Sequence, residues 1–238
     1  TEDYKSFSRK FLFQLTDDQE RAINDVILDL ETGKLMDRLI CGDVGFGKTE
    51  VALRTSFILA NSGYQVALVA PTTILVKQHY KSFSERFKTT SLNISSLSRM
   101  TSLKDRNKIK NDLKTGEVNI VIGTHALLSN DVDFNNLGLL IIDEEQHFGV
   151  AQKEKIKELQ GNIHVLTLSA TPIPRTLQLS LSGLKQLSLI TTPPVNRLSI
   201  RTFVLEWDKV VLLDALNREK NRGCLLYTSD AADEAWCG

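Results

Sequence analysis

The fold is decided by the stretch Gly42-Asp43-Val44-Gly45-Phe46-Gly47-Lys48-Thr49. It fits the pattern G-x-x-x-x-G-K-[S/T], and it lies between an apolar run typical of a strand and a helical pattern, as that motif requires. Its glycines let backbone N–H groups face a phosphate, beside the positive end of the following helix. Lys48 is then expected to reach the β- and γ-phosphates of a nucleotide, and Thr49 to offer its hydroxyl to Mg²⁺. A plain glycine-rich turn is the alternative, but it leaves the lysine unexplained.

A second group of polar residues follows the apolar run at residues 139–142, namely Asp143 and Glu144. Ligands of open α/β sheets bind at the carboxyl ends of the strands, so both carboxylates are expected to face the loop. Asp143 would hold Mg²⁺, directly or through water, and Glu144 would orient and deprotonate the attacking water. Acidic residues after a strand are often only a turn. Together with the phosphate loop, they predict a site for ATP hydrolysis.

Short apolar runs alternate with helical patterns along the chain, which is the order that builds a parallel sheet covered by helices. The expected helices include one opened by Thr16 and closed by Gly33, and one that begins at Lys48. The expected strands lie at residues 38–41, 65–70, 93–97, 119–123, 139–143, 164–168 and 186–190. The predicted fold class is α/β, with a mostly parallel sheet flanked by helices on both faces. Prolines at 193–194 mark the edge of this domain, and a strand at 200–205 and a helix at 209–220 are expected beyond it.

Composition describes an ordinary folded protein of 238 residues, with 42% hydrophobic and 24% charged residues. The apolar runs are too short for a membrane span, and no basic-then-apolar leader opens the chain, so a cytoplasmic location is expected. A net charge of zero argues against a dedicated nucleic-acid binder. Residues 77–114 nevertheless carry ten Lys or Arg against three acidic residues. This surplus fits either a phosphate backbone or two solvated helix faces.

Gln19 has two interpretations. It forms a capping box with Thr16, or its amide reads the edge of an adenine base. Residues at other strand ends are ordinary turn formers when taken singly. Their position raises their interest, because loops after parallel strands emerge on one edge, where hydroxyl and N–H donors suit phosphate contacts. These residues are Pro71, Thr72, Gly123, Thr124, His125, Ser169 and Thr171.

Together the motifs resemble the first RecA-like domain of a superfamily 2 helicase motor. The matching segments are residues 15–19, 42–49, 71–79, 123–128, 143–146 and 169–176. Three stretches are closer to one group within this superfamily, the bacterial transcription-repair coupling factors (Mfd): residues 48–52, 143–150 and 192–197. RecG-type branch-migration helicases usually have serine where Phe46 stands and Asp-Glu-Gln-His at 143–146, so the chain is more similar to the coupling factors.

The resemblance implies an ATP- and Mg²⁺-dependent motor that translocates on double-stranded DNA, removes stalled RNA polymerase and recruits excision-repair proteins. It implies that Gln19 reads adenine and that Glu50 belongs with the phosphate loop in the ATP site. Gln146, Ser169 and Thr171 would couple hydrolysis to movement. The residues along DNA would be Pro71, Thr72, Gly123, Thr124 and His125. His147 departs from the usual arginine of these proteins, and a histidine is mostly neutral at pH 7.

The resemblance also divides the chain. We expect a linker at residues 1–13, the first RecA-like domain at 14–195, and the start of a second at 196–223. Residues 224–238 resemble a translated sequencing adapter and are expected to be non-native. The arginine finger of such motors lies in the second domain and contributes about 10³–10⁵ in rate. We therefore expect little turnover from these residues alone. A nucleotide-binding module without motor activity is the remaining alternative.

Overall fold

The computed structural model describes the chain except for residues 1, 171–185, 195–203, 205 and 222–238. The chain separates into two units, Thr1–Arg197 and Leu198–Gly238. In the second unit the described part contains helix α8 (Lys209–Asn221), which the sequence predicted. Of the strand expected at 200–205 only Val204 is described, and the expected tail at 224–238 lies outside the described residues. The predicted domain bounds therefore stay predictions.

The first unit contains one seven-stranded sheet, in which all recorded pairings are parallel. Its order is β3-β4-β2-β5-β6-β1-β7. In chain order the strands are β1 (Asp37–Gly42), β2 (Gln65–Val69), β3 (Ile94–Leu97), β4 (Ile120–Gly123), β5 (Leu137–Asp143), β6 (His164–Ser169) and β7 (Gln186–Ile190). All seven predicted strands are confirmed. Only β5 begins two residues early, because Leu137 already pairs with Gln65 of β2.

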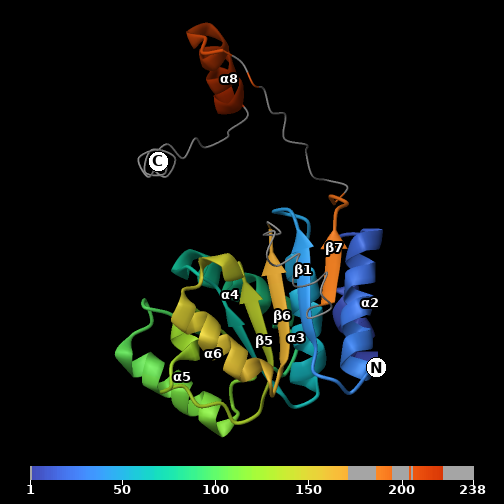
Figure 1. Cartoon of the computed structure of the whole chain (residues 1–238), viewed down its shortest axis with the longest axis vertical. Coiled ribbons are helices and arrows are strands. Elements are labelled where there is room, and N and C mark those ends of the chain that lie inside the picture. The colour runs from blue at the N-terminus through green and yellow to red at the C-terminus, as the bar shows by residue number, and fades with distance from the viewer. Residues whose placement is uncertain (1, 171–185, 195–203, 205, 222–238) are drawn as a thin grey trace. The chain divides into compact units, whose positions relative to one another are not determined.

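Helices cover both faces of this sheet (Figure 1). One apolar cluster joins the sheet to α1 (Glu2–Arg9), α2 (Asp17–Glu31), α3 (Lys48–Asn61) and α4 (Thr73–Phe87). The other joins it to α5 (Leu103–Thr115), α6 (Val150–Gln160) and the short turns η1 (His125–Leu128) and η2 (Glu145–His147), the last through the adjacent Phe148. Along β5, Leu139 and Ile141 enter the first cluster, while Leu140 and Ile142 enter the second. This alternation is why the strand is apolar throughout.

The N-terminal segment differs from the expected linker, because Glu2–Arg9 forms helix α1. Phe7 is 1% exposed, and its ring stacks on Phe57 at a centroid distance of 4.2 Å. The helix is polar except for one narrow face, so its composition reads like that of a solvated segment. The signal in the sequence was the three- and four-residue spacing of Tyr4, Phe7 and Phe11.

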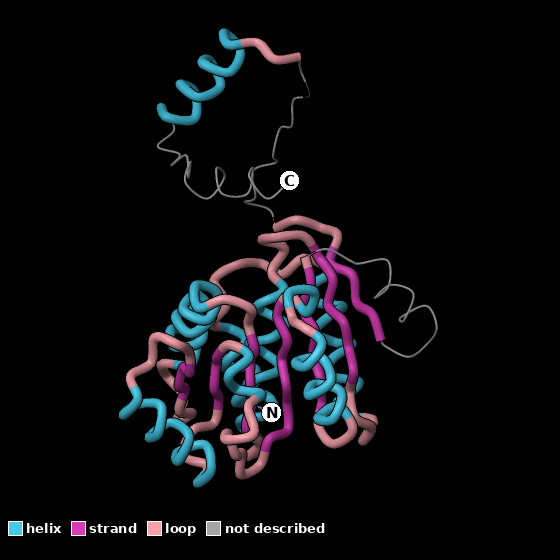
Figure 2. Tube along the Cα trace, turned by 60° about the vertical axis from the view of Figure 1, so that its left-hand side comes forward, coloured by secondary structure: helices cyan, strands magenta, loops and turns pink. Residues whose placement is uncertain are grey.

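Parallel strands bring all their carboxyl ends to one edge of the sheet, and Figure 2 shows the strands running side by side through the molecule. This edge collects the ends of β1, β2, β4, β5 and β6, at Gly42, Val69, Gly123, Asp143 and Ser169. Within the described residues, no helix has the length and apolar character needed to cross a membrane.

Candidate functional site

The phosphate loop joins β1 to α3 and is curled by its own residues. Gly45 and Gly47 have φ values of 80° and 83°, a left-handed region in which a Cβ is strained. The Asp43 carbonyl accepts a hydrogen bond from Phe46 N–H at 3.1 Å, and the Asp43 carboxylate accepts one from Val44 N–H at 2.8 Å. The loop therefore has the compact turn that a phosphate-binding motif needs.

Lys48, the first residue of α3, lies over this loop. Its Nζ donates hydrogen bonds to the carbonyls of Gly42 at 2.6 Å and Asp43 at 3.2 Å. Burial lowers the pKa of Lys48, while the carboxylates of Glu144 and then Asp143 act in the opposite direction. These electrostatic interactions show that the tertiary structure brings the predicted catalytic lysine close to both predicted acids.

Asp143 ends β5, and its side chain is nearly buried, at 10% exposure. Its Oδ2 is 2.7 Å from Nε2 of His79, a buried residue of α4. Among the described residues, no three metal-ligating side chains form a cluster. By donor type the Thr49 hydroxyl and the Asp143 carboxylate nevertheless suit Mg²⁺, because this ion is typically held by one or two protein groups together with waters and substrate phosphates.

Glu144 follows in a left-handed conformation, with φ 51° and ψ 58°. Its backbone N–H donates to the Leu168 carbonyl at 3.0 Å. Its carboxylate accepts hydrogen bonds from the Ala170 N–H, at 3.2 Å, and from the Gln146 side chain. Of the predicted coupling residues, Gln146 thus contacts Glu144 directly, and Ser169 precedes the contacting Ala170. Thr171 lies outside the described residues.

The side chain of Gln19 caps helix α2 and at the same time contacts the phosphate loop. The capping box is present: Gln19 Oε1 accepts from Thr16 N–H at 3.0 Å, and Thr16 Oγ1 accepts from Gln19 N–H at 3.3 Å. The other end of the same amide donates from Nε2 to the Phe46 carbonyl in the phosphate loop, at 2.8 Å. An amide has two donors and two acceptor lone pairs, so capacity for a purine edge is left over. The adenine contact itself stays a prediction.

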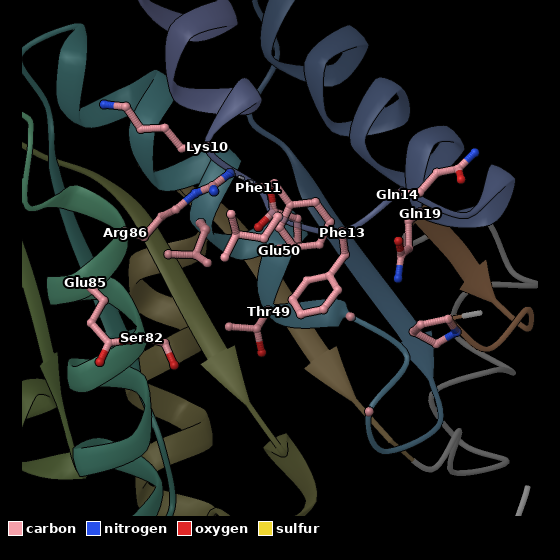
Figure 3. A pocket seen from close by; sticks show the side chains of 15 residues that line it. Lys10, Phe11, Phe13, Gln14, Gln19, Thr49, Glu50, Ser82, Glu85 and Arg86 are labelled. Atoms are coloured by element: carbon pink, nitrogen blue, oxygen red, sulfur yellow. Dashed lines mark hydrogen bonds and ion pairs between the residues drawn. The ribbon is translucent and has the colours of Figure 1, made fainter. Parts of the chain in front are cut away.

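A pocket of about 580 Å³ lies beside the loop. Figure 3 shows the ring of Phe13 between Thr49 and Gln19 in that view, and all three line the pocket. Phe13 is 62% exposed, and its ring meets the edge of the Phe11 ring at a centroid distance of 5.6 Å. Sequence reasoning missed Phe11 and Phe13 as pocket residues. The available signal was two aromatic residues just ahead of the capping box.

Glu50 lies on the wall of this pocket at 4% exposure. Its Oε1 accepts hydrogen bonds from Arg54 Nε at 2.8 Å and Arg86 Nη2 at 3.0 Å. Burial raises the pKa of Glu50, and the two arginines oppose that shift. The Arg86 guanidinium also lies over the rings of Phe7 and Phe11, at 4.8 and 5.5 Å from their centroids. Glu50 therefore stabilises the pocket wall by binding Arg54 and Arg86. Its position beside Thr49 in the sequence did not reveal this arrangement.

The five residues predicted along DNA lie at the carboxyl ends of β2 and β4, which share one sheet edge. Gly123 and Thr124 are buried there, and a Cβ at Gly123 would lie 2.4 Å from the Leu97 carbonyl oxygen. Thr72 and His125 have exposed side chains, and Thr72 caps α4 by accepting from Leu75 N–H at 3.3 Å. Pro71 is partly buried. Packing accounts for Gly123, and the DNA contacts remain predictions.

The basic surplus at 77–114 is partly neutralised within the first unit. Lys110 pairs with Asp131, and Lys114 pairs with Asp133 at 3.2 Å. Arg86 belongs to the Glu50 network. These pairs favour the interpretation of α5 as a solvated helix over a continuous phosphate track.

A family model described as DEAD/DEAH box helicase matches residues 16–180, well over half of the chain. The chain belongs to the DEAD/DEAH box helicase family. The matched segment of this helicase chain starts at the Thr16 cap and includes the phosphate loop, both acids and Ser169.

Curated relatives of this helicase chain are transcription-repair-coupling factors. It is 57% identical over 226 residues to that of Rickettsia bellii, covering 93% of the chain and 20% of the relative. It is 52% identical over 223 residues to that of Bacillus subtilis, covering 94% and 19%, and 49% identical over 226 residues to that of Escherichia coli, covering 95% and 20%. The predicted similarity to coupling factors is confirmed, and the chain spans about a fifth of the length of these relatives.

Solved structures give the same fold. The structure of RecG bound to a three-way DNA junction superimposes with a TM-score of 0.79 at 36% identity, covering 93% of this helicase chain and 30% of RecG. The Hef helicase domain of Pyrococcus furiosus superimposes with a TM-score of 0.56 at 21% identity, covering 74% and 41%, and supports the fold alone. The predicted RecA-like α/β class is confirmed.

Proposed function

We propose that this chain is the ATP-binding motor domain of a double-stranded DNA translocase that removes stalled RNA polymerase in transcription-coupled repair. The observation that carries the proposal is that Lys48, Asp143 and Glu144 lie at one sheet edge, near enough for both carboxylates to act on the charge of the lysine, in a chain 49–58% identical to coupling factors. RNA polymerase and excision-repair proteins would bind through other regions of a longer protein. A cytoplasmic location fits this proposed role in DNA repair.

The residues of the site have separate tasks in ATP hydrolysis. Lys48 and the N–H groups of the loop bind the phosphates, and Thr49 and Asp143 hold Mg²⁺. When bound, Mg²⁺ neutralises charge that develops on the phosphate oxygens. Glu144 orients the attacking water and accepts its proton. The amide of Gln146 and the N–H of Ala170 hold that carboxylate in place.

The pocket beside the loop provides a site for the nucleobase. The exposed ring of Phe13 supplies an aromatic face, and the adjacent Gln19 amide supplies donors and acceptors for the adenine edge. Because Gln19 also bonds the Phe46 carbonyl, a change at the base would reach the phosphate loop through one side chain. DNA contacts would involve the exposed Thr72 and His125 first.

A RecG-type fork remodeller is the second candidate, and the superposition with RecG at 36% identity favours it. Phe46 and the order Asp143-Glu144-Glu145-Gln146 speak for the coupling factor, because RecG-type proteins usually differ at both places. The parent protein separates the two. A coupling factor should carry a polymerase-interacting domain ahead of this region, and a fork remodeller should carry a fork-binding wedge.

Replacing Lys48 by alanine tests the site. We expect the 238-residue chain to bind Mg-ATP, and Lys48→Ala to weaken that binding about ten- to a hundredfold, the effect of losing charge-assisted hydrogen bonds. Equilibrium binding of a fluorescent ATP analogue measures it, and the exposed Lys34→Ala is the matched control. We expect little DNA-stimulated hydrolysis from the chain alone. Robust turnover would contradict the expected need for a second domain.

The full-length parent decides between the two candidates. It should release RNA polymerase stalled on DNA in an ATP-dependent reaction, and the Lys48→Ala parent should not. A parent that remodels forks but leaves polymerase in place would overturn the coupling-factor proposal in favour of the RecG-type candidate.

A further inference from the structure

The contact between His79 and Asp143 links a helix to the metal side of the site. Both side chains are about nine-tenths buried, at 9% and 10% exposure, and Nε2 and Oδ2 are 2.7 Å apart. Asp143 is the last residue of β5, whereas His79 lies 64 positions earlier on α4. The hydrolysis chemistry described above uses Asp143 but assigns nothing to His79.

The direction of this hydrogen bond follows from the chemistry of its partners. An ionised carboxylate only accepts hydrogen bonds, so Nε2 of His79 must carry the proton it donates to Oδ2. Among the described residues, no hydrogen bond is recorded for the other carboxylate oxygen, Oδ1. The imidazole therefore fixes the rotation of the carboxylate and leaves one oxygen available. Groups that orient a metal-binding carboxylate in this way typically alter metal affinity about 10–100-fold when they are replaced.

Helix α4 connects this contact to the part of the sheet edge that is predicted to lie along DNA. The helix starts at Thr73, directly after the Thr72 cap in a loop predicted to lie along DNA. With a rise of 1.5 Å per residue, His79 lies about 9 Å further along the helix axis. Val76, Phe83 and Phe87 bury the inner face of α4 in the core. The cap and the imidazole therefore belong to one packed, continuous helix.

We propose that His79 is a positioning residue for Asp143: its Nε2–H holds Oδ2 so that the carboxylate presents Oδ1 to Mg²⁺, and α4 connects this carboxylate to the loop at Thr72. The inference rests on the proposed ATP site and adds a residue to it. The position of the metal-binding carboxylate would then depend on a helix that begins next to Thr72, one of the residues predicted to lie along DNA.

Magnesium titrations of the 238-residue chain test the proposal without measuring catalysis. The probe is the fluorescent, non-hydrolysable analogue mant-AMPPNP, with binding recorded at increasing Mg²⁺ and in excess EDTA. His79→Leu removes the donor and should raise the Mg²⁺ concentration for half-maximal binding about tenfold or more, with metal-free binding unchanged. His79→Gln places an amide nitrogen near the Nε2 position and should restore most of the Mg²⁺ response. The neighbouring, exposed Gln78→Leu is the matched control and should behave as wild type.

The outcomes separate this inference from the proposed function. If wild type shows no Mg²⁺-dependent binding, the ATP site itself is refuted and the role of His79 with it. If wild type responds but His79→Leu has the same Mg²⁺ midpoint, His79 does not position Asp143 for the metal. This conclusion holds even if the His79→Leu variant is thermally less stable. Should His79→Leu not fold, His79→Asn replaces it, because its shorter amide cannot reach the Nε2 position. Equal midpoints for His79→Asn and His79→Gln would then overturn the proposal.

Discussion

At the scale of single residues, Gly47 shows how the loop and the capping box depend on each other. Its φ of 83° favours glycine, and a Cβ there would lie 2.3 Å from Gln19 Nε2. Gln19 is held in that place by its bonds to Thr16 and Phe46. One position thus satisfies a backbone requirement and a packing requirement, and the second exists only in the folded chain.

Alanine at Gly47 should therefore cost more than left-handed strain alone. Strain of this kind is about 1–2 kcal/mol per residue. Gly33→Ala is the matched control, because Gly33 has a φ of 70° and nothing within 4 Å of the added Cβ. We expect Gly47→Ala to lose more unfolding free energy than Gly33→Ala in urea denaturation, and to weaken ATP-analogue binding as well. Equal losses in both variants would show that Gln19 yields without cost.

At the scale of elements, Asp18 fastens the first turn of α2 to the segment after β7. Its Oδ2 accepts hydrogen bonds from the N–H and hydroxyl groups of both Thr191 and Thr192, at 2.8 to 3.0 Å. These bonds, with the Thr191 hydroxyl first, lower the pKa of Asp18 to about 2. Asp18 thus connects the helix that carries Gln19 to the strand end that leads towards residue 195.

This carboxylate predicts a specific dependence of stability on pH. The folded pKa of about 2 lies below the ordinary value of 3.8, so the stabilisation is full above about pH 4 and is lost as the pH falls towards 2. Asp18→Asn should lower the free energy of unfolding by about 1–3 kcal/mol at pH 6. Urea denaturation at pH 6, 4 and 3 should show the gap to wild type shrinking at the acid end. Asp17→Asn, at an exposed neighbour, should show no gap, and a gap for Asp18→Asn that is independent of pH would contradict the argument.

At the scale of the whole first unit, the N-terminal helix is part of the core. Phe7 lies between α3 and α4, with its ring 4.2 Å from Phe57 and 4.9 Å from Phe87 between centroids. Arg86 then connects these rings to Glu50 on the pocket wall. The segment at residues 10–14 that lines the pocket is therefore anchored from the helix before it.

Truncating this anchor should destabilise the whole unit. Phe7→Ala should cost about 3–5 kcal/mol in chemical denaturation, as expected for a buried aromatic side chain. Phe13→Ala is the matched control, because Phe13 is 62% exposed and its loss should change stability by about 0.5 kcal/mol or less. Phe13→Ala should instead weaken binding of the ATP analogue. A Phe7→Ala variant as stable as Phe13→Ala would show that residues 2–9 contribute no more to stability than a linker does.

The sequence alone predicted the class of fold, the seven strands and the phosphate loop. Each of these follows from local rules: runs of apolar residues for strands buried on both faces, and a glycine-rich turn with Lys48 between strand and helix. It also placed Asp143 and Glu144 at the end of a strand, and a parallel sheet brings such ends to one edge. What it did not identify was helix α1, because the three- and four-residue spacing of its few apolar side chains is a weak signal.

Only the tertiary structure decided which side chains complete the site. Gln19 bonds Phe46 at a separation of 27 positions, Arg86 bonds Glu50 at 36, and His79 bonds Asp143 at 64. Such contacts depend on the order of strands in the sheet and on how each helix is rotated against it. Local patterns do not encode that geometry, because it arises when the two faces of the sheet pack their helices together. The phosphate loop can therefore be predicted from the sequence, whereas the residues that hold Gln19, Glu50 and Asp143 in place can be identified only from the fold.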